Sequence, residues 1–315
     1  MARKARGNAV PDWRKTAALL FLPLLFGGAV PASAACNAAA TEAMQRALDR
    51  AAVFAWDDAI AAFAAIRAAD PACSPPTWPS RALDRLQYAD LQTGRDEAAR
   101  ALIAEGGART GAVLAARYAL ERNAWDEAAA LPLPATADAE AQATVRYARA
   151  LGAARRGKAA AAALDIAALD RIVGGLAGEA GQRLGNAAEA AKAWIALAGG
   201  ASGAALARLR VAAEREDAGA GGGVAANPLL PLRELLADML FETGDFAGAV
   251  REYEMSLKAA PRRMRAYWAA GRAAESAGNR EATRRLYGDF AALCEAASCI
   301  RPGRLTALKR SMAAP

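Results

Sequence analysis

Few residues of this 315-residue chain could carry out chemistry, and the chain contains no histidine. Without His, Ser-His-Asp and Cys-His catalysis and His-ligated zinc are excluded. The stretch GAARRGKA has the spacing of a phosphate-binding loop through Gly152, Gly157 and Lys158. Ala159, however, stands where such a loop has the Ser or Thr that holds magnesium, and a helical pattern precedes it where a strand is needed. The stretch therefore indicates the turn of a helical repeat.

Other nucleophiles and acids fit structural roles. Ser202, in GGASGA, lacks the last Gly of a nucleophile elbow and has no strand before it, so we interpret it as a helix cap. Adjacent carboxylates such as Asp57 and Asp58 could serve acid–base chemistry, but solvated charge is far commoner at helix ends. We therefore expect no catalytic residue, no metal ligand and no cofactor, and a protein that is not an enzyme.

Composition predicts helices. Hydrophobic residues make up 55% of the chain but aromatic ones only 6%, and the abundant Ala favours close-packed helices over sheets. The formal charge of +7 is unevenly spread, with +4 in the first 34 residues and +3 in the rest. A generally basic nucleic-acid-binding surface is therefore not indicated.

The first 34 residues read as a secretory signal peptide. A basic segment precedes the apolar stretch TAALLFLPLLFGGAV, and PASA offers Ala32 and Ala34 to a signal peptidase, so cleavage is predicted after Ala34. An uncleaved anchor is the alternative, although the strongly apolar core is about ten residues where a span needs roughly twenty. Lipidation of Cys36 is a third reading, but Ser33 stands where a lipoprotein signal usually has Leu. We expect a soluble periplasmic or secreted protein.

The four cysteines indicate disulfides. Cys36, Cys73, Cys294 and Cys299 lack the CxxC spacing of a zinc ribbon or thioredoxin-like site. An even number of cysteines in an exported protein is typical of structural bridges. Two disulfides are therefore expected.

A repeated unit organises the C-terminal part. The stretch GDFAGAVREYEMSLKAAP (244–261) follows a helical segment, and the plan recurs with a second turn at Gly278, 34 residues after Gly244. The period and the placement of Gly244, Phe246, Ala249, Tyr253 and Pro261 resemble the tetratricopeptide repeat, whose unit is a helical hairpin. Residues 54–71 match at the same offsets, and the segments between are weaker or only helical.

This resemblance implies an all-α fold, a superhelix or solenoid of antiparallel helical hairpins. The expected divisions are a signal peptide (1–34), degenerate repeats (35–217), a Gly-rich linker (218–227) and a C-terminal repeat pair with a capping helix (228–315). As a whole the chain looks like exported bacterial tetratricopeptide-repeat proteins, a likeness that implies no single function.

In proteins of this kind the first helix of each hairpin lines a concave groove that holds peptide segments. By that register the groove-facing residues are Glu234, Asp238 and Glu242 on one helix and Arg265, Trp268 and Arg272 on the next. The alternative is that the acidic residues form interhelical salt bridges with neighbouring Arg residues. Residues 258–310 hold twelve basic and four acidic side chains, which favours an acidic partner.

The resemblance implies a non-catalytic scaffold or adaptor in the bacterial cell envelope that binds a protein or peptide. The alternatives are a cell-wall enzyme on a helical solenoid, such as a glycosidase, and a structural lipoprotein anchored through Cys36.

The solenoid also predicts the disulfide pairing. With about eight or nine hairpins, each adding roughly 10 Å, the two ends lie far apart, whereas a disulfide needs Cα atoms within about 7 Å. Local pairs are then expected, Cys36 with Cys73 and Cys294 with Cys299. The second pair requires the last helix to end near Ala297.

Overall fold

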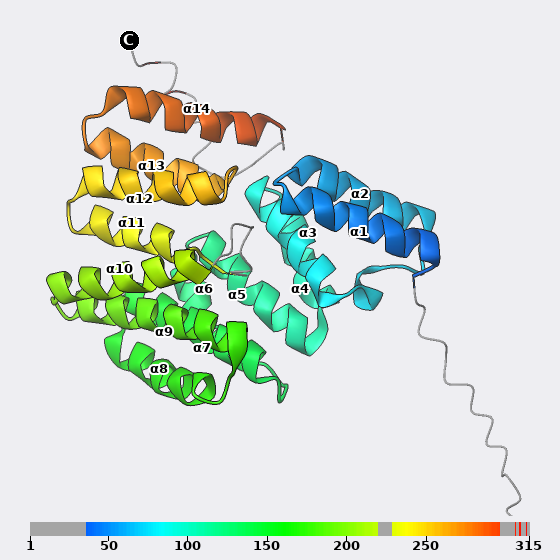
Figure 1. Ribbon diagram of the computed structural model, residues 1–315, viewed down its shortest axis with the longest axis horizontal. Coiled ribbons are helices and arrows are strands. Elements are labelled where there is room, and N and C mark those ends of the chain that lie inside the picture. The colour runs from blue at the N-terminus through cyan, green and yellow to red at the C-terminus, as the bar shows by residue number, and fades with distance from the viewer. Residues whose placement is uncertain (1–35, 220–228, 297–305, 307–308, 310–312, 314–315) are drawn as a thin grey trace, which may run out of the picture. The chain divides into compact units, whose positions relative to one another are not determined.

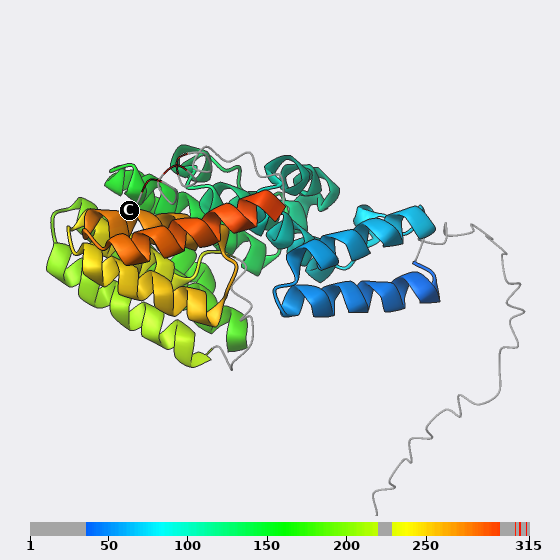
Figure 2. The ribbon, with the colours of Figure 1, turned by 90° about the horizontal axis from the view of Figure 1, so that it is seen from above.

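The computed structural model describes residues 36–219 and 229–296, together with 306, 309 and 313. These residues hold fourteen α-helices and no strand, which confirms the all-α fold class. Within the described residues the helices pair into seven antiparallel hairpins, where eight or nine were expected for the whole chain. Figures 1 and 2 show the pairing, most clearly for α11 to α14, which lie side by side in chain order.

The first helices of the hairpins are α1 (Ala38–Ala52), α3 (Ser80–Gln92), α5 (Ala112–Glu121), α7 (Ala139–Arg155), α9 (Gly178–Ala198), α11 (Leu232–Glu242) and α13 (Met264–Ser276). The second helices are α2 (Trp56–Ala69), α4 (Asp96–Glu105), α6 (Trp125–Ala129), α8 (Ala159–Val173), α10 (Ser202–Gly219), α12 (Phe246–Ala259) and α14 (Arg280–Ala296). A 3-10 turn η1 (Pro75–Thr77) and a π-helical turn η2 (Gly107–Gly111) complete the described elements.

One residue with a positive φ stands between the two helices of every hairpin. Five of these residues are Gly, as the left-handed conformation favours, and two are Phe54 and Asn123. The Gly residues are Gly94, Gly157, Gly200, Gly244 and Gly278. In GAARRGKA, Gly157 is thus the turn between α7 and α8, and Lys158 is the residue before α8. The stretch follows a helix, as its interpretation as a repeat turn requires.

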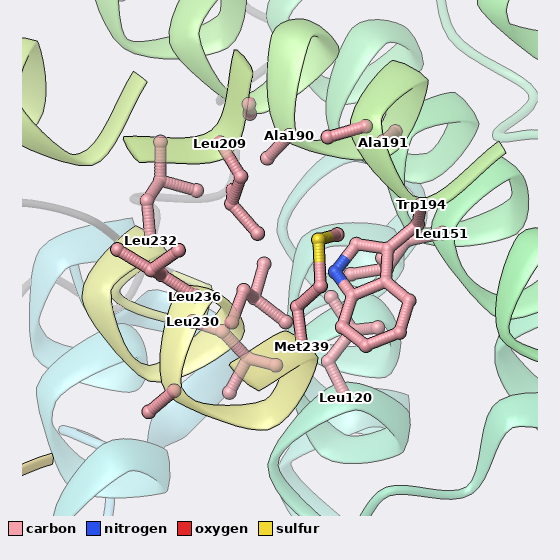
Figure 3. Packing of buried hydrophobic residues seen from close by; sticks show 14 of the residues in the cluster. Leu120, Leu151, Ala190, Ala191, Trp194, Leu209, Leu230, Leu232, Leu236 and Met239 are labelled. Carbon is pink, nitrogen blue, oxygen red and sulfur yellow. The ribbon is translucent and has the colours of Figure 1, made fainter. Parts of the chain in front are cut away.

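Most of the core is continuous from α5 to α14 and is built largely from Ala and Leu. In Figure 3, Trp194 of α9 lies against Leu120, Leu151 and Met239, which come from three other first helices. A second cluster serves the N-terminal hairpins and contains Phe63, whose ring lies 5.3 Å from that of Trp78.

The disulfide between Cys36 and Cys73 is present, with the two Cα atoms 4.5 Å apart, and it matches the predicted pairing. It joins the residues that flank the α1–α2 hairpin. Cys294 is also disulfide-bonded. Cys299 and the predicted helix end near Ala297 lie outside the described residues, as does the predicted signal peptide. Of the predicted linker, 220–227 lie outside them, and Ala218 and Gly219 end α10.

The prediction that the first and last hairpins lie far apart is wrong. The Trp56 indole Nε1 donates to the Arg262 carbonyl oxygen at 3.3 Å, and Arg262 Nη1 donates to the Phe54 carbonyl oxygen at 3.1 Å. Helix α13 also contacts α3. Small rotations between successive hairpins accumulate along a repeat array, so the series curves back on itself.

Within the described residues, no helix is both long and apolar enough to cross a membrane.

Candidate partner-binding site

The six predicted groove residues lie in three different environments. Glu234 and Asp238 on α11 and Arg265 on α13 are buried, with exposed fractions of 0%, 9% and 3%. Glu242 and Arg272 are exposed, and Trp268 is half-buried. The structure therefore brings three of them together and separates the other three.

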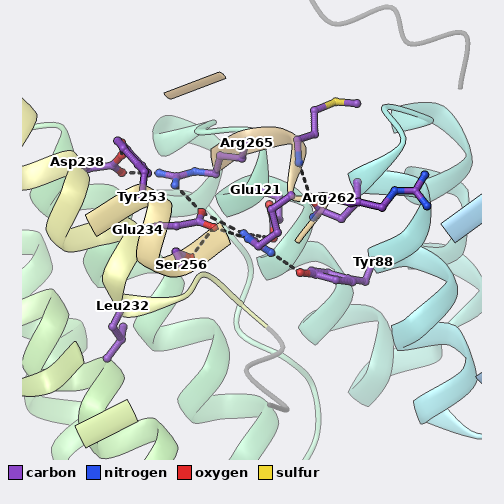
Figure 4. A network of polar contacts seen from close by, with 12 residues as sticks. Tyr88, Glu121, Leu232, Glu234, Asp238, Tyr253, Ser256, Arg262 and Arg265 are labelled. Carbon is purple, nitrogen blue, oxygen red and sulfur yellow. Dashed lines mark hydrogen bonds and ion pairs between the residues drawn. The ribbon is translucent and has the colours of Figure 1, made fainter. Parts of the chain in front are cut away.

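Arg263, which precedes α13, lies at the centre of a buried ionic network. Its Nε and Nη2 donate to Glu234, its Nη2 donates to Glu121 Oε1 at 2.9 Å, and its Nη1 donates to the Tyr88 hydroxyl. These partners come from α11, α5 and α3. Figure 4 shows Glu234, Glu121 and Tyr88 converging on this point. One guanidinium thus ties the loop before α13 to three earlier helices.

Arg265 extends the network. Its Nη1 donates to Glu234 Oε2 at 2.9 Å, its Nη2 to Asp238 Oδ2, and its Nε to Asn123 Oδ1 at 3.0 Å. The Tyr253 hydroxyl donates to the other oxygen of Asp238. Burial acts to raise the pKa of Glu234, but Arg263 and Arg265 outweigh it and hold that pKa below its ordinary value. Glu234 is therefore ionised and paired.

This network matches the interhelical salt bridges named as the alternative role for the acidic positions. All three nitrogens of Arg265 bond the chain's own side chains, so a partner segment has no access to it in this structure. A part for these residues in partner binding stays a prediction.

Glu242 and Arg272 belong to a different surface, which we call the rim. It comprises Trp125, Arg155, Phe241, Glu242, Phe246 and Arg272. Arg155 Nη2 lies 2.8 Å from Glu242 Oε1, and its guanidinium lies 4.7 Å from the Trp125 ring and 3.9 Å from the Trp194 ring. Arg272 lies 5.1 Å from the Phe241 ring, which packs edge-on against Phe246.

Burial raises the pKa of Glu242, and the charge of Arg155 opposes that shift. Along the rim the aromatic rings are half-buried, Arg155 is mostly covered and Arg272 is exposed, a mixture of aromatic and charged groups that favours protein contacts.

Trp268 supports the last hairpin. Its ring lies 5.3 Å from those of both Tyr287 and Phe290 on α14. A Cβ at Gly271 would lie 2.5 Å from the Tyr287 ring, so this Gly permits the contact. The side chain therefore contributes to packing between α13 and α14.

Sequence reasoning missed Tyr88, Glu121, Arg155 and Arg263. The first three share a register with predicted residues, because Glu242 and Asp238 stand two and six positions before the turn residue Gly244. Glu121 and Arg155 occupy the place of Glu242, and Tyr88 occupies that of Asp238. Arg263 lies in a loop and has no such signal.

The carboxylates considered for acid–base chemistry lie in the first turn of α2. Asp57 lies 3.4 Å from Arg95 and 3.3 Å from Arg262, so it joins the α1–α2 hairpin to the C-terminal part. Ser202 is the first residue of α10. In the described part of the chain, no group of three or more Cys, Asp or Glu is arranged to hold a metal ion.

No protein-family model matches this chain, and no curated protein matches it significantly. Among solved structures, a tetratricopeptide repeat protein from Parabacteroides merdae ATCC 43184 is similar, with a TM-score of 0.40 and 14% identity. The likeness covers 87% of this chain and 98% of the other.

Proposed function

We propose that this protein is a non-catalytic scaffold for protein–protein interaction in the bacterial cell envelope. The observation that carries the proposal is the rim, where hairpins remote in sequence place half-exposed aromatic rings beside charged groups. Arg and aromatic residues are enriched among the side chains that dominate binding energy in protein interfaces. A surface of this kind suits a partner segment laid across several helix ends.

The envelope location rests on the N-terminal pattern and on the disulfide between Cys36 and Cys73. Disulfides persist in oxidising compartments and are rare in the cytosol. We propose that the signal peptide is cleaved after Ala34, so that the exported chain begins at Ala35. Mass spectrometry of the mature N-terminus tests this, because an acylated chain would begin at Cys36.

We further propose that the partner is acidic near the C-terminal hairpins. Between 258 and 296 the chain has eight basic and four acidic residues. The buried pair Arg263 and Arg265 is neutralised internally, so the contribution to a partner comes from exposed groups such as Arg272.

Crosslinking of the exported protein in its own envelope tests the scaffold. We expect specific partners with the wild type and their loss with the rim double variant Glu242→Arg, Arg272→Glu, with circular dichroism unchanged. Arg208→Glu is the matched control, since Arg208 is a half-exposed member of an ion pair on α10, outside the rim. Capture of no specific partner, or equal capture by the rim variant, would contradict the proposal.

A further inference from the structure

Helix α6 is much shorter than the other second helices. It has 5 residues, whereas α2 and α12 have 14 each and α8 has 15. Pro132 and Pro134 follow it, and Pro lacks the N–H that a continuing helix needs. Beyond Ala129, α6 therefore no longer covers α7 and α8.

A cavity of ≈ 430 Å³ lies at this place, lined by the end of α6 and by α7 and α8. We call it the outer groove and define it by Arg146, Arg149, Lys158, Leu164 and Asp165. Arg146 and Arg149 lie one helical turn apart on α7, and Leu164 and Asp165 lie together on α8. Side chains from two helices therefore face the space that a longer α6 would fill.

The wall formed by the α6 stub is held in place. A Cβ at Gly152 would lie 2.6 Å from the Trp125 carbonyl oxygen and 2.7 Å from the Ala129 nitrogen, so α6 packs directly on the α7 backbone. Arg149 Nη1 donates to the Leu131 carbonyl oxygen at 2.6 Å and fixes the chain just after α6. The groove is therefore built into the hairpin junction.

Cations outnumber carboxylates around the outer groove. Asp165 accepts from both Arg146 Nη1 at 3.1 Å and Arg149 Nε at 2.9 Å, so one carboxylate faces two guanidiniums. On the opposite side Asp126 lies 3.0 Å from Arg156 and 3.9 Å from Lys158. Among the lining residues, three cations against two carboxylates leave an excess of one positive charge.

Two further features point to a peptide. Arg146 Nε is buried without a hydrogen-bond partner among the described residues, and Asp165 is mostly buried beneath the two guanidiniums. Leu164 is 76% exposed, an apolar side chain beside the cations. A polyphosphate backbone would gain nothing from Leu164, whereas an acidic segment with an apolar residue uses both the positive charge and the Leu.

We propose that the outer groove binds a short acidic segment of a partner protein, with an apolar side chain over Leu164 and a carboxylate on Arg146, Arg149 and Lys158. The proposal rests on the scaffold function and places the contact on a surface other than the rim. The segment occupies the space left by the short α6.

A phage-displayed library of short random peptides, selected on the mature chain 35–315, is the probe. We expect the selected peptides to place Asp or Glu next to Leu, Ile or Phe. Synthetic copies should bind at least about tenfold more weakly to Leu164→Asp and to Lys158→Glu, by fluorescence anisotropy. Both side chains are exposed, so these variants should keep the wild-type circular dichroism.

The matched controls are Val211→Asp, an exposed apolar residue on α10, and Lys258→Glu, an exposed cation on α12. We expect unchanged affinity for both. Amidation of the peptide C-terminus shows which carboxylate binds. Loss of binding indicates the terminal carboxylate, and retained binding indicates Asp or Glu side chains; both outcomes support the proposal. Equal affinity for the groove variants, peptides without acidic residues, or tighter binding of single-stranded RNA at the groove would overturn it.

Envelope crosslinking separates this proposal from the scaffold function. If the wild type and Leu164→Asp capture the same partners and the rim variant loses them, the scaffold function is supported and the groove proposal is overturned. If selected peptides require the groove but no partner is captured in the envelope, the groove is supported as a peptide site and the scaffold function is overturned.

Discussion

Guanidinium–carboxylate pairs occur both in the buried network around Arg263 and in the outer groove, but their surroundings differ. Arg263 and Glu234 are at most 1% exposed, whereas in the groove the Arg146 and Arg149 side chains are 22% and 28% exposed. In the network every charge has a partner in the chain, and removal of one leaves another charge buried. In the groove Asp165 is buried beneath the guanidiniums, while solvent reaches and screens the two cations. The same residue types therefore join helices in one region and present charge in the other.

The largest effect is expected from Arg263→Met. The change leaves Glu234 and Glu121 with one cation fewer in a buried site, and breaking a buried pair in this way costs about 3–5 kcal/mol. Urea unfolding at neutral pH measures this free energy. Arg208→Met, which removes a half-exposed pair with Glu189, should cost no more than about 1 kcal/mol. Equal effects of the two variants would erase the distinction between the regions.

Asp90 is a buried carboxylate whose neighbouring cation only partly offsets the effect of burial. Burial raises the pKa of Asp90 from 3.8 to about 7, and Arg95 offsets this only in part. The folded state therefore holds this proton more tightly than the unfolded chain, so the unfolding free energy falls as pH rises from about 4 to about 7. Asp90→Asn should remove that fall, a relative gain on the order of 4 kcal/mol above pH 7.

Urea unfolding of wild type and Asp90→Asn across this pH range gives the difference curve. The exposed Asp49→Asn serves as the control and should leave the curve unchanged. A constant difference between wild type and Asp90→Asn would show that Asp90 does not titrate in this range.

Loss of the Cys36–Cys73 disulfide should act mainly on the N-terminal hairpins. The bridge closes a loop with a sequence separation of 37, and its removal by the double change to Ser should cost about 2–4 kcal/mol. Hydrogen exchange should quicken in α1 and α2, which belong to a separate apolar cluster, and stay unchanged in α9 to α12. Uniform acceleration would instead indicate one cooperative unit.

The smallest effect is expected from Gly152→Ala at the wall of the outer groove. The added Cβ would lie 2.8 Å from that of Ala128 and closer still to the backbone of α6, so the stub must shift. Overpacking costs about 1–3 kcal/mol, and the helix preference of Ala over Gly offsets part of this cost. The free energy of unfolding should therefore fall by about 1–2 kcal/mol, as measured by thermal unfolding. Gly203→Ala in α10 has nothing within 4 Å and should be neutral or stabilising. An equal loss of stability in Gly203→Ala would contradict the close packing of α6 on α7 at Gly152.

Much of the local structure was readable from the sequence. The turn at Gly244, the second helix from Phe246 and the buried Tyr253 follow from residue types at fixed offsets, and so does the pairing of Cys36 with Cys73. Glu234, Asp238 and Arg265 were predicted to face a partner-binding groove, with interhelical salt bridges as the alternative. Their burial was not predicted, because the segments that cover them, around Tyr88 and Glu121, are remote in sequence.

The sequence by itself determined the helical hairpins, because Ala-rich periodicity, left-handed turn residues and Pro stops act within one repeat. It also determined the early end of α6, since Pro132 and Pro134 act locally. Only the tertiary structure decided that α13 returns to α3 and that Arg263 enters a buried network, because curvature is the sum of small rotations over many hairpins. Whether an Arg–carboxylate pair joins helices or faces solvent depends on that sum, which no single repeat encodes.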